Sequence, residues 1–159
     1  ATSYVKSLRG LNICSQGFLT GSIDLVFHDD KDPSESHWWV VDWKSNWIGQ
    51  RNDDGQSIEC GPAYYHYQAI EQQMTQHHYP LQAHLYMVAL HRFLRWRLKG
   101  YEPKKHLGGY VYIFLRGIPG KEIMTKKYLI NEVPGLVVEP APIQRILALD
   151  HLLEKGGQR

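Results

Sequence analysis

The stretch that decides the fold is GSIDLVF, residues 21–27, followed after a polar loop by WWVVDWKSN, residues 38–46. Asp24, Asp42 and Lys44 interrupt runs of apolar and β-branched residues that predict two strands. Buried strands exclude charged side chains unless these are paired or bind a metal ion. The two stretches therefore predict a β-hairpin that carries a functional cluster of charges.

The composition indicates one folded domain. Of the 159 residues, 43% are apolar and 12% aromatic, enough to bury a core. The formal charge of +2 is too small to indicate nucleic-acid binding by itself. Two cysteines, Cys14 and Cys60, argue against a disulfide framework or a four-cysteine metal site. We expect a cytoplasmic protein, because no apolar run approaches the ~18 residues of a membrane span and no signal peptide is evident.

Periodicity and turn residues predict the element order β-β-α-α-β-α. After the hairpin we expect two helices, a third strand and a C-terminal amphipathic helix, at residues 63–78, 80–100, 108–117 and 142–156, respectively. Residues 49–62 predict a long polar loop. The order predicts an α/β fold with a mixed central β-sheet flanked by helices.

Asp42 and Lys44 lie two positions apart, so their side chains share one face of the second strand. The hairpin brings Asp24 beside them, and two carboxylates without a cation would repel each other. Mg²⁺ resolves this repulsion, because it takes carboxylate and carbonyl oxygens. We expect Asp24, Asp42 and the backbone carbonyl of Trp43 to bind Mg²⁺, with Mn²⁺ as a substitute. Lys44 would then stabilise charge on a phosphate or an attacking water, which is the chemistry of phosphodiester hydrolysis.

A single Asp-x-Lys pair is more often a salt bridge than a catalytic site. The joint pattern favours a site, because both acids interrupt strands that otherwise predict burial, and burial without a ligand is costly. Trp39 and Trp43 share the opposite strand face, where we expect core packing. Trp47 follows the strand and is free to meet DNA or a partner.

Four segments, together covering most of residues 17–117, carry a family resemblance. They are GFLTGSIDLVF, VVDWKSNWIG, HHYPLQAHLYMVALHRFLRWRL and GGYVYIFLRG. In this order and spacing they resemble the PD-(D/E)xK nuclease superfamily and, within it, the C-terminal nuclease domains of RecB subunits of exodeoxyribonuclease V. The resemblance implies a restriction-endonuclease-like core, and residues 1–159 as a single nuclease domain from a longer helicase–nuclease chain.

By this resemblance the two acids bind the metal ion and Lys44 is the catalytic lysine. Gln82 and Tyr86 match the QxxxY motif of the following helix. Positions four apart share a helix face, and Tyr79, three before Gln82, extends that face. Such side chains can orient DNA phosphates. From the residues alone an alternative remains open, in which Tyr86 packs in the core and Gln82 is simply exposed.

The family's third metal ligand has no counterpart upstream of the hairpin. Residues 1–23 contain no Asp, Glu or His, whereas the family supplies a histidine or glutamate from an upstream helix. We therefore expect weak Mg²⁺ binding and slow cleavage, because two carboxylates alone must offset dehydration of the ion.

Arg92, Arg95 and Lys99 form a basic stripe on the second helix. A solvated helix face is the ordinary explanation for such charges. In a nuclease the same stripe would contact DNA phosphates without reading bases.

The charged cluster predicts a metal-dependent phosphodiester hydrolase, and the resemblance implies that it is a DNA nuclease acting in double-strand-break repair and recombination. The partners that the resemblance implies are DNA, a helicase region of the same parent chain, the RecC and RecD subunits and the RecA recombinase. No interaction with a membrane is expected. One alternative is a noncatalytic DNA-binding or protein-docking fragment that is inactive without the upstream ligand. Another is a standalone resolvase or restriction-type nuclease.

Overall fold

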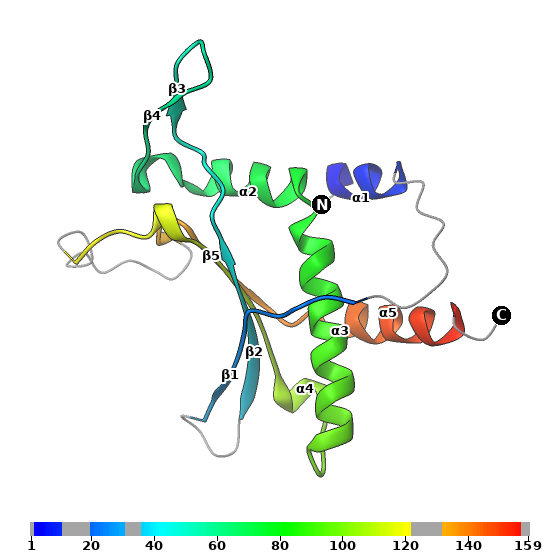
Figure 1. Ribbon diagram of the computed structural model, residues 1–159. Helices are drawn as coiled ribbons and strands as arrows, with labels where there is room; N and C mark the ends of the chain where they lie inside the picture. Colours follow the sequence, from blue (N-terminus) through cyan, green and yellow to red (C-terminus); the bar gives the residue numbers. More distant parts are fainter. Residues whose placement is uncertain (1, 11–19, 31–35, 122–131, 157–159) are drawn as a thin grey trace.

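Four strands form the central sheet of the computed structural model, which describes residues 2–10, 20–30, 36–121 and 132–156 (Figure 1). The strands are β1 (Leu25–Asp29), β2 (His37–Lys44), β5 (Leu107–Phe114) and β6 (Leu136–Pro140), in the order β1-β2-β5-β6. The β2–β5 pair is parallel, and the two outer pairs are antiparallel. The sheet is therefore mixed, as predicted.

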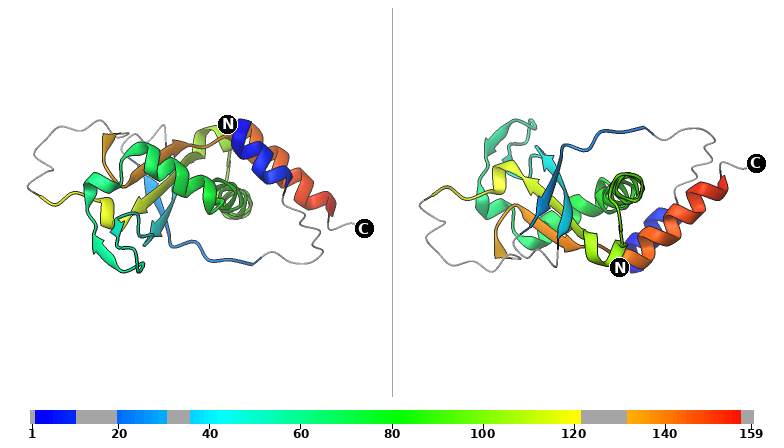
Figure 2. Two further views of the ribbon diagram at one scale, coloured as in Figure 1. Left: turned by 90° about the horizontal axis from the view of Figure 1, so that it is seen from above. Right: turned by 90° about the horizontal axis from the view of Figure 1, so that it is seen from below.

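Helices α2 (Tyr67–Gln76), α3 (Tyr79–Arg97) and α5 (Ile143–Gly156) contribute to the core beside this sheet. Figure 2, seen along α3, shows this helix end-on beside the strands. Shorter elements are α1 (Thr2–Arg9), α4 (Pro103–His106) and 3₁₀ turns at Pro62–Tyr64 and Leu115–Gly117. None of the helices in the described ranges is long and apolar enough to cross a membrane. The architecture confirms the predicted mixed α/β fold.

The predicted hairpin is present, with β1 shorter than the sequence pattern indicated. Asp24 lies in an exposed bend just before the strand, and Leu25 is the first paired residue. The expectation that both acids lie inside strands is therefore correct for Asp42 and wrong for Asp24. Residues 17–19 of the predicted strand lie outside the described residues, as does Cys14.

The two long helices after the hairpin form close to their predicted positions. A 3₁₀ turn begins at Pro62, so α2 starts four residues later than expected, at Tyr67. His78 adopts a left-handed conformation with φ of 54°, which separates α2 from α3. Pro80 then occupies the first turn of α3, where its missing N–H is tolerated.

Some elements were not predicted. The polar stretch 49–62 contains a small hairpin of β3 (Gln50–Arg51) and β4 (Ser57–Glu59). Strand β6 also escaped prediction, because it is only five residues long and its alternation is weak. The element order is accordingly richer than β-β-α-α-β-α.

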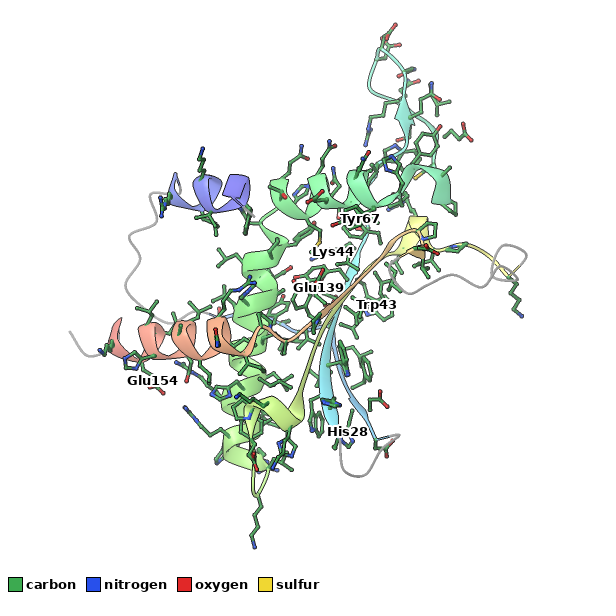
Figure 3. All side chains as sticks on the ribbon, turned by 180° about the vertical axis from the view of Figure 1, so that it is seen from behind. His28, Trp43, Lys44, Tyr67, Glu139 and Glu154 are labelled. Atoms are coloured by element: carbon green, nitrogen blue, oxygen red, sulfur yellow. The ribbon has the colours of Figure 1, made fainter. Side chains whose placement is uncertain are left out.

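The two faces of β2 are used in the opposite way from that expected. Val40, Asp42 and Lys44 are buried, on the side of the sheet that α3 covers. Trp43 points to the other side, as Figure 3 shows, and is 44% exposed. Trp39, on the same face, is half-buried and stacks on Phe27, itself exposed. The prediction of core packing is therefore wrong for Trp43, because the helices pack on the face that carries the charges.

Candidate active site

Asp24 and Asp42 occupy facing positions at the end of the hairpin. Leu25 pairs with Val41, so the next position places Asp24 opposite Asp42. Oδ2 of Asp24 accepts a hydrogen bond of 2.9 Å from the backbone N–H of Trp43. Because the N–H and C=O of one strand residue point to the same side, the Trp43 carbonyl also faces Asp24. The three predicted oxygen donors thus lie at one corner of the sheet.

Lys44 projects from β2 toward α3 and is held from several sides (Figure 3). Its Nζ lies 2.5 Å from Oδ2 of Asp42 and donates a 2.9 Å hydrogen bond to Oε1 of Gln82. The rings of Tyr79 and Tyr112 lie 3.9 Å and 5.0 Å from the same Nζ, measured to their centroids, as in cation–π contacts. The ammonium therefore has one defined position beside the acids.

Gln82 and Tyr86 project from α3 into the same network. Nε2 of Gln82 donates to the hydroxyl of Tyr86 over 3.0 Å, and both side chains are partly buried. The alternative of a simply exposed Gln82 is therefore wrong. Tyr79, on the same face, donates through its hydroxyl to Oδ1 of Asn46, just beyond β2. The helix thus presents three polar tips to the end of the strand.

Sequence reasoning missed Tyr112, which lies opposite Asp42 on β5. Its side chain is 1% exposed, and its hydroxyl lies 3.0 Å from both Oε1 of Gln82 and the carbonyl of Tyr79. A signal was present: a tyrosine in a buried strand needs a partner for its hydroxyl. Which tyrosine joins the site depends on the pairing of β2 with β5, and no local pattern specifies that pairing.

Burial and neighbouring charges act on the site's titratable groups. Burial raises the pKa of the Asp42 carboxyl, the Lys44 ammonium opposes this, and the Asp24 carboxylate adds to it. Burial also raises the pKa of the Tyr86 hydroxyl, and both carboxylates contribute. Burial, followed by the charge of Asp42, raises the pKa of Tyr112 as well. Two carboxylates and two phenols therefore share one electrostatic environment.

The donor set at this corner fits a hard divalent cation. Oδ2 of Asp42 is buried and contacts Nζ of Lys44 at 2.5 Å, and a carboxylate oxygen with one such partner retains a lone pair for a cation. Asp24 and the Trp43 carbonyl add oxygens of the type that Mg²⁺ prefers. Within the described ranges no group of three or more His, Cys, Asp or Glu side chains is placed to hold a metal ion. The described donor set therefore consists of two carboxylates and one carbonyl.

The basic stripe of α3 is engaged in ion pairs with α5. Nε of Arg92 lies 2.5 Å from Oδ1 of the buried Asp150. Arg95 reaches Oδ2 of Asp150 at 3.3 Å and Glu154 at 3.1 Å. These contacts give both arginines a role in fixing α5 to α3. Lys99 is exposed beyond the end of the helix, and DNA binding by the stripe stays a prediction.

A groove of about 540 Å³ opens beside the site. Gln82 and Tyr86 line it together with Leu85 and Ala89 of α3. Thr20, Gly21 and Ile23 form part of its lining. Another cavity of similar volume lies between α2 and β6 and is not lined by any of the predicted site residues. The first groove is therefore the one continuous with the charged cluster.

No protein-family model matches the chain. The chain is similar to "RecBCD enzyme subunit RecB" of Mycobacterium tuberculosis, Mycolicibacterium smegmatis and Escherichia coli, at 36%, 42% and 36% identity over 141, 139 and 122 residues. These matches cover 89%, 87% and 77% of this chain but only 11%, 12% and 9% of the respective relatives. The chain thus spans about a tenth of the length of these curated relatives. Such identity over most of the chain shows that it is homologous to one segment of the RecB subunit, consistent with a fragment matching the C-terminal region of that family.

Proposed function

We propose that this chain is a metal-dependent deoxyribonuclease domain of the exodeoxyribonuclease V type, which hydrolyses DNA phosphodiesters during double-strand-break repair and recombination. One observation carries the proposal: Asp24, Asp42 and Lys44 converge at the end of β2, beside the Gln82–Tyr86 pair of α3. Homology to RecB, named as a subunit of the RecBCD enzyme, supports it.

Each residue has a task that its contacts support. Asp24, Asp42 and the Trp43 carbonyl would hold Mg²⁺ or Mn²⁺. A bound divalent ion would lower the pKa of an attacking water and offset phosphate charge. Lys44 stabilises the negative charge that develops in the transition state. Gln82 holds the Lys44 ammonium through its Oε1.

Tyr86 and Tyr79 would orient the substrate. The hydroxyl of Tyr86 accepts from Gln82, so its own proton remains available to donate to a phosphate oxygen. Tyr79 covers Lys44 with its ring and reaches Asn46 with its hydroxyl. The aromatic cover limits water around Lys44, which strengthens its interaction with charge.

Homology to RecB supports the proposed partners. We propose DNA as the substrate and the RecBCD enzyme as the assembly in which the domain acts. Within it the domain would meet the helicase region of its parent chain and the RecC and RecD subunits, and it would assist the RecA recombinase.

Cleavage of labelled linear single-stranded DNA tests the proposal. The 159-residue chain is incubated with Mg²⁺, with Mn²⁺ and with EDTA, beside the Asp42→Ala and Lys44→Ala variants. Matched controls are Asp53→Ala and Lys104→Ala, which remove exposed charges elsewhere. We expect metal-dependent cutting that both site variants lose by at least about 100-fold and both controls keep.

The same experiment has a second informative outcome, because only two carboxylates are described at the site. Since no cluster of three acidic, imidazole or thiolate ligands occurs in the described part of the chain, catalysis could require a ligand from elsewhere. A folded chain that binds DNA but cuts none under any metal condition would overturn the nuclease proposal for these residues. It would favour the DNA-binding or docking fragment.

A further inference from the structure

Helix α3 carries a pair of exposed aromatic side chains near its C-terminal end. Phe93 is 51% exposed and Trp96 is 75% exposed. Their rings meet edge to face, with centroids 6.4 Å apart. Because the two exposed rings adjoin, they form an apolar patch of the kind that marks interaction sites. No contact described above for the site uses them.

This pair lies on the same helix face as the site residues. Gln82, Tyr86, Ala89, Phe93 and Trp96 follow one another at intervals of four, three, four and three residues, which keeps them on one side of a helix. At a rise of about 1.5 Å per residue, Phe93 lies about 10 Å and Trp96 about 15 Å along the axis from Tyr86. Figure 1 shows α3 running without a break from α2 to the level of α4.

A groove lines α3 between the site and the aromatic pair. The groove of about 540 Å³ is lined by α3 residues from Leu81 to Ala89, with Gln82 and Tyr86 among them. Phe93 follows Ala89 after one helical turn on the same face. A flexible linear ligand in the groove lies beside Gln82, which holds Lys44, and would reach the aromatic pair beyond Ala89.

Positive charge borders the pair. The guanidinium carbon of Arg97 lies 4.9 Å from the ring centroid of Trp96. Arg92 and Arg95 are neutralised by Asp150 and Glu154. Arg97, by contrast, forms no ion pair with any residue that the structure describes. Its charge is free to meet a phosphate, which favours a nucleic-acid strand over an apolar protein segment as the occupant.

We propose that Phe93 and Trp96 form a stacking subsite for the bases of single-stranded DNA, with Arg97 contacting the backbone, so that the strand runs along α3 into the site. This inference rests on the proposed function and adds the residues that bind the strand outside the site. Aromatic side chains stack on bases of any sequence, but only where those bases are not already paired within a duplex. The subsite therefore selects single strands without selecting sequence.

A binding experiment on uncut DNA tests the subsite. All chains in this experiment carry Lys44→Met, so that the DNA stays uncut. The fluorescence anisotropy of a labelled 12-nucleotide single strand reports the affinity. Phe93→Ala and Trp96→Ala are compared with Tyr67→Ala, which removes a 70% exposed tyrosine from α2. Two matched ligands are compared with this strand. One is the same strand with abasic sugars in place of its bases, and the other is a 12-base-pair duplex. Urea midpoints of the variants verify that these surface changes leave folding intact.

We expect each aromatic variant to bind the single strand about tenfold more weakly, the loss anticipated for one stacked base. The slope of affinity against salt should not change for them, whereas Arg97→Ala should reduce it by about one. The abasic strand should bind the Lys44→Met chain more weakly than the intact strand binds either aromatic variant, because it loses both stacking contacts. Variants that bind within twofold of Tyr67→Ala, or a duplex that binds as tightly as the single strand, would overturn the subsite.

Cleavage with Lys44 in place separates this inference from the function on which it rests. Metal-dependent cutting together with unchanged binding in the aromatic variants would support the nuclease proposal and overturn the proposed subsite. Base-dependent binding without any cutting would keep the subsite and remove the nuclease. A chain that neither binds nor cuts DNA would overturn both.

Discussion

Tyr112 and Gln82 meet between β5 and α3, where the tyrosine hydroxyl lies 3.0 Å from Oε1 of the amide. The same Oε1 accepts a hydrogen bond from Lys44, and Nε2 of Gln82 donates to Tyr86. A buried phenol on the sheet therefore fixes which way the amide faces. The amide in turn fixes the lysine, so Tyr112 is a positioning residue for the proposed reaction.

Replacing Tyr112 with Phe should impair turnover more than binding. The ring that contacts Lys44 remains, but Gln82 loses one of its two donors. We expect kcat for DNA cleavage to fall about three- to tenfold, in line with ~1 kcal/mol for one hydrogen bond, and KM to stay unchanged. Steady-state kinetics checks this. Tyr110→Phe is the control, since it alters the same strand face outside the site's hydrogen bonds; equal loss in both variants would refute a positioning role.

The buried pair of Asp42 and Lys44 should show strong coupling in stability. Their side chains are 5% and 10% exposed, so removing one charge leaves the other buried with less compensation. We expect Lys44→Met and Asp42→Asn each to lower the free energy of unfolding by about 2–4 kcal/mol, and the double variant to lose less than their sum by about 1–3 kcal/mol. Urea denaturation of the four proteins measures the cycle. Additive losses would show that the two charges do not interact in solution.

Gly109 should tolerate no side chain, because β5 meets its neighbours closely there. Its φ is +155°, and an added Cβ would lie 2.0 Å from the carbonyl oxygen of Glu139 and 2.8 Å from the ring of Trp39. We expect Gly109→Ala to destabilise the protein by about 3 kcal/mol or more. Gly100→Ala is the control: φ there is +75° with open space, so only backbone strain of about 1 kcal/mol applies. Similar unfolding midpoints for the two variants would contradict the close packing.

His91 should make stability fall in mild acid. Burial lowers the pKa of its imidazole; Asp150 opposes this shift, Arg95 and Arg92 add to it, and Glu154 opposes it. Below the unfolded value of about 6.5 the unfolded chain binds a proton that the folded chain resists, so the free energy of unfolding decreases as pH falls from there toward the folded pKa. Above pH 6.5 this contribution is constant.

His91→Gln should remove that part of the pH dependence. Urea midpoints at pH 7.5, 6.0 and 5.0 are compared with those of His66→Gln, which replaces an exposed histidine. We expect the native chain and the His66 variant to lose stability between pH 7.5 and 5.0 more steeply than the His91 variant. Parallel curves for all three proteins would show that His91 titrates alike in both states.

Local patterns in the sequence were sufficient for the hairpin, for α3 and for the positions of Asp42 and Lys44. Alternation with a period of two places these residues on one strand face, whichever fold surrounds the strand. Spacing of three and four residues likewise places Tyr79, Gln82 and Tyr86 on one helix face. These relationships act over a few residues, so the chain determines them by itself.

Tertiary structure alone decided which face of β2 the helices cover and which residues complete the site. Trp43 is more apolar than Lys44, yet α3 packs over Lys44, because the tyrosines and Gln82 satisfy its charge there. Tyr112 joins the site through pairing between strands that lie about seventy positions apart in the chain. Arg92 likewise forms an ion pair with Asp150 of α5. Contacts of this kind depend on register and on the packing of distant elements, which no local period encodes.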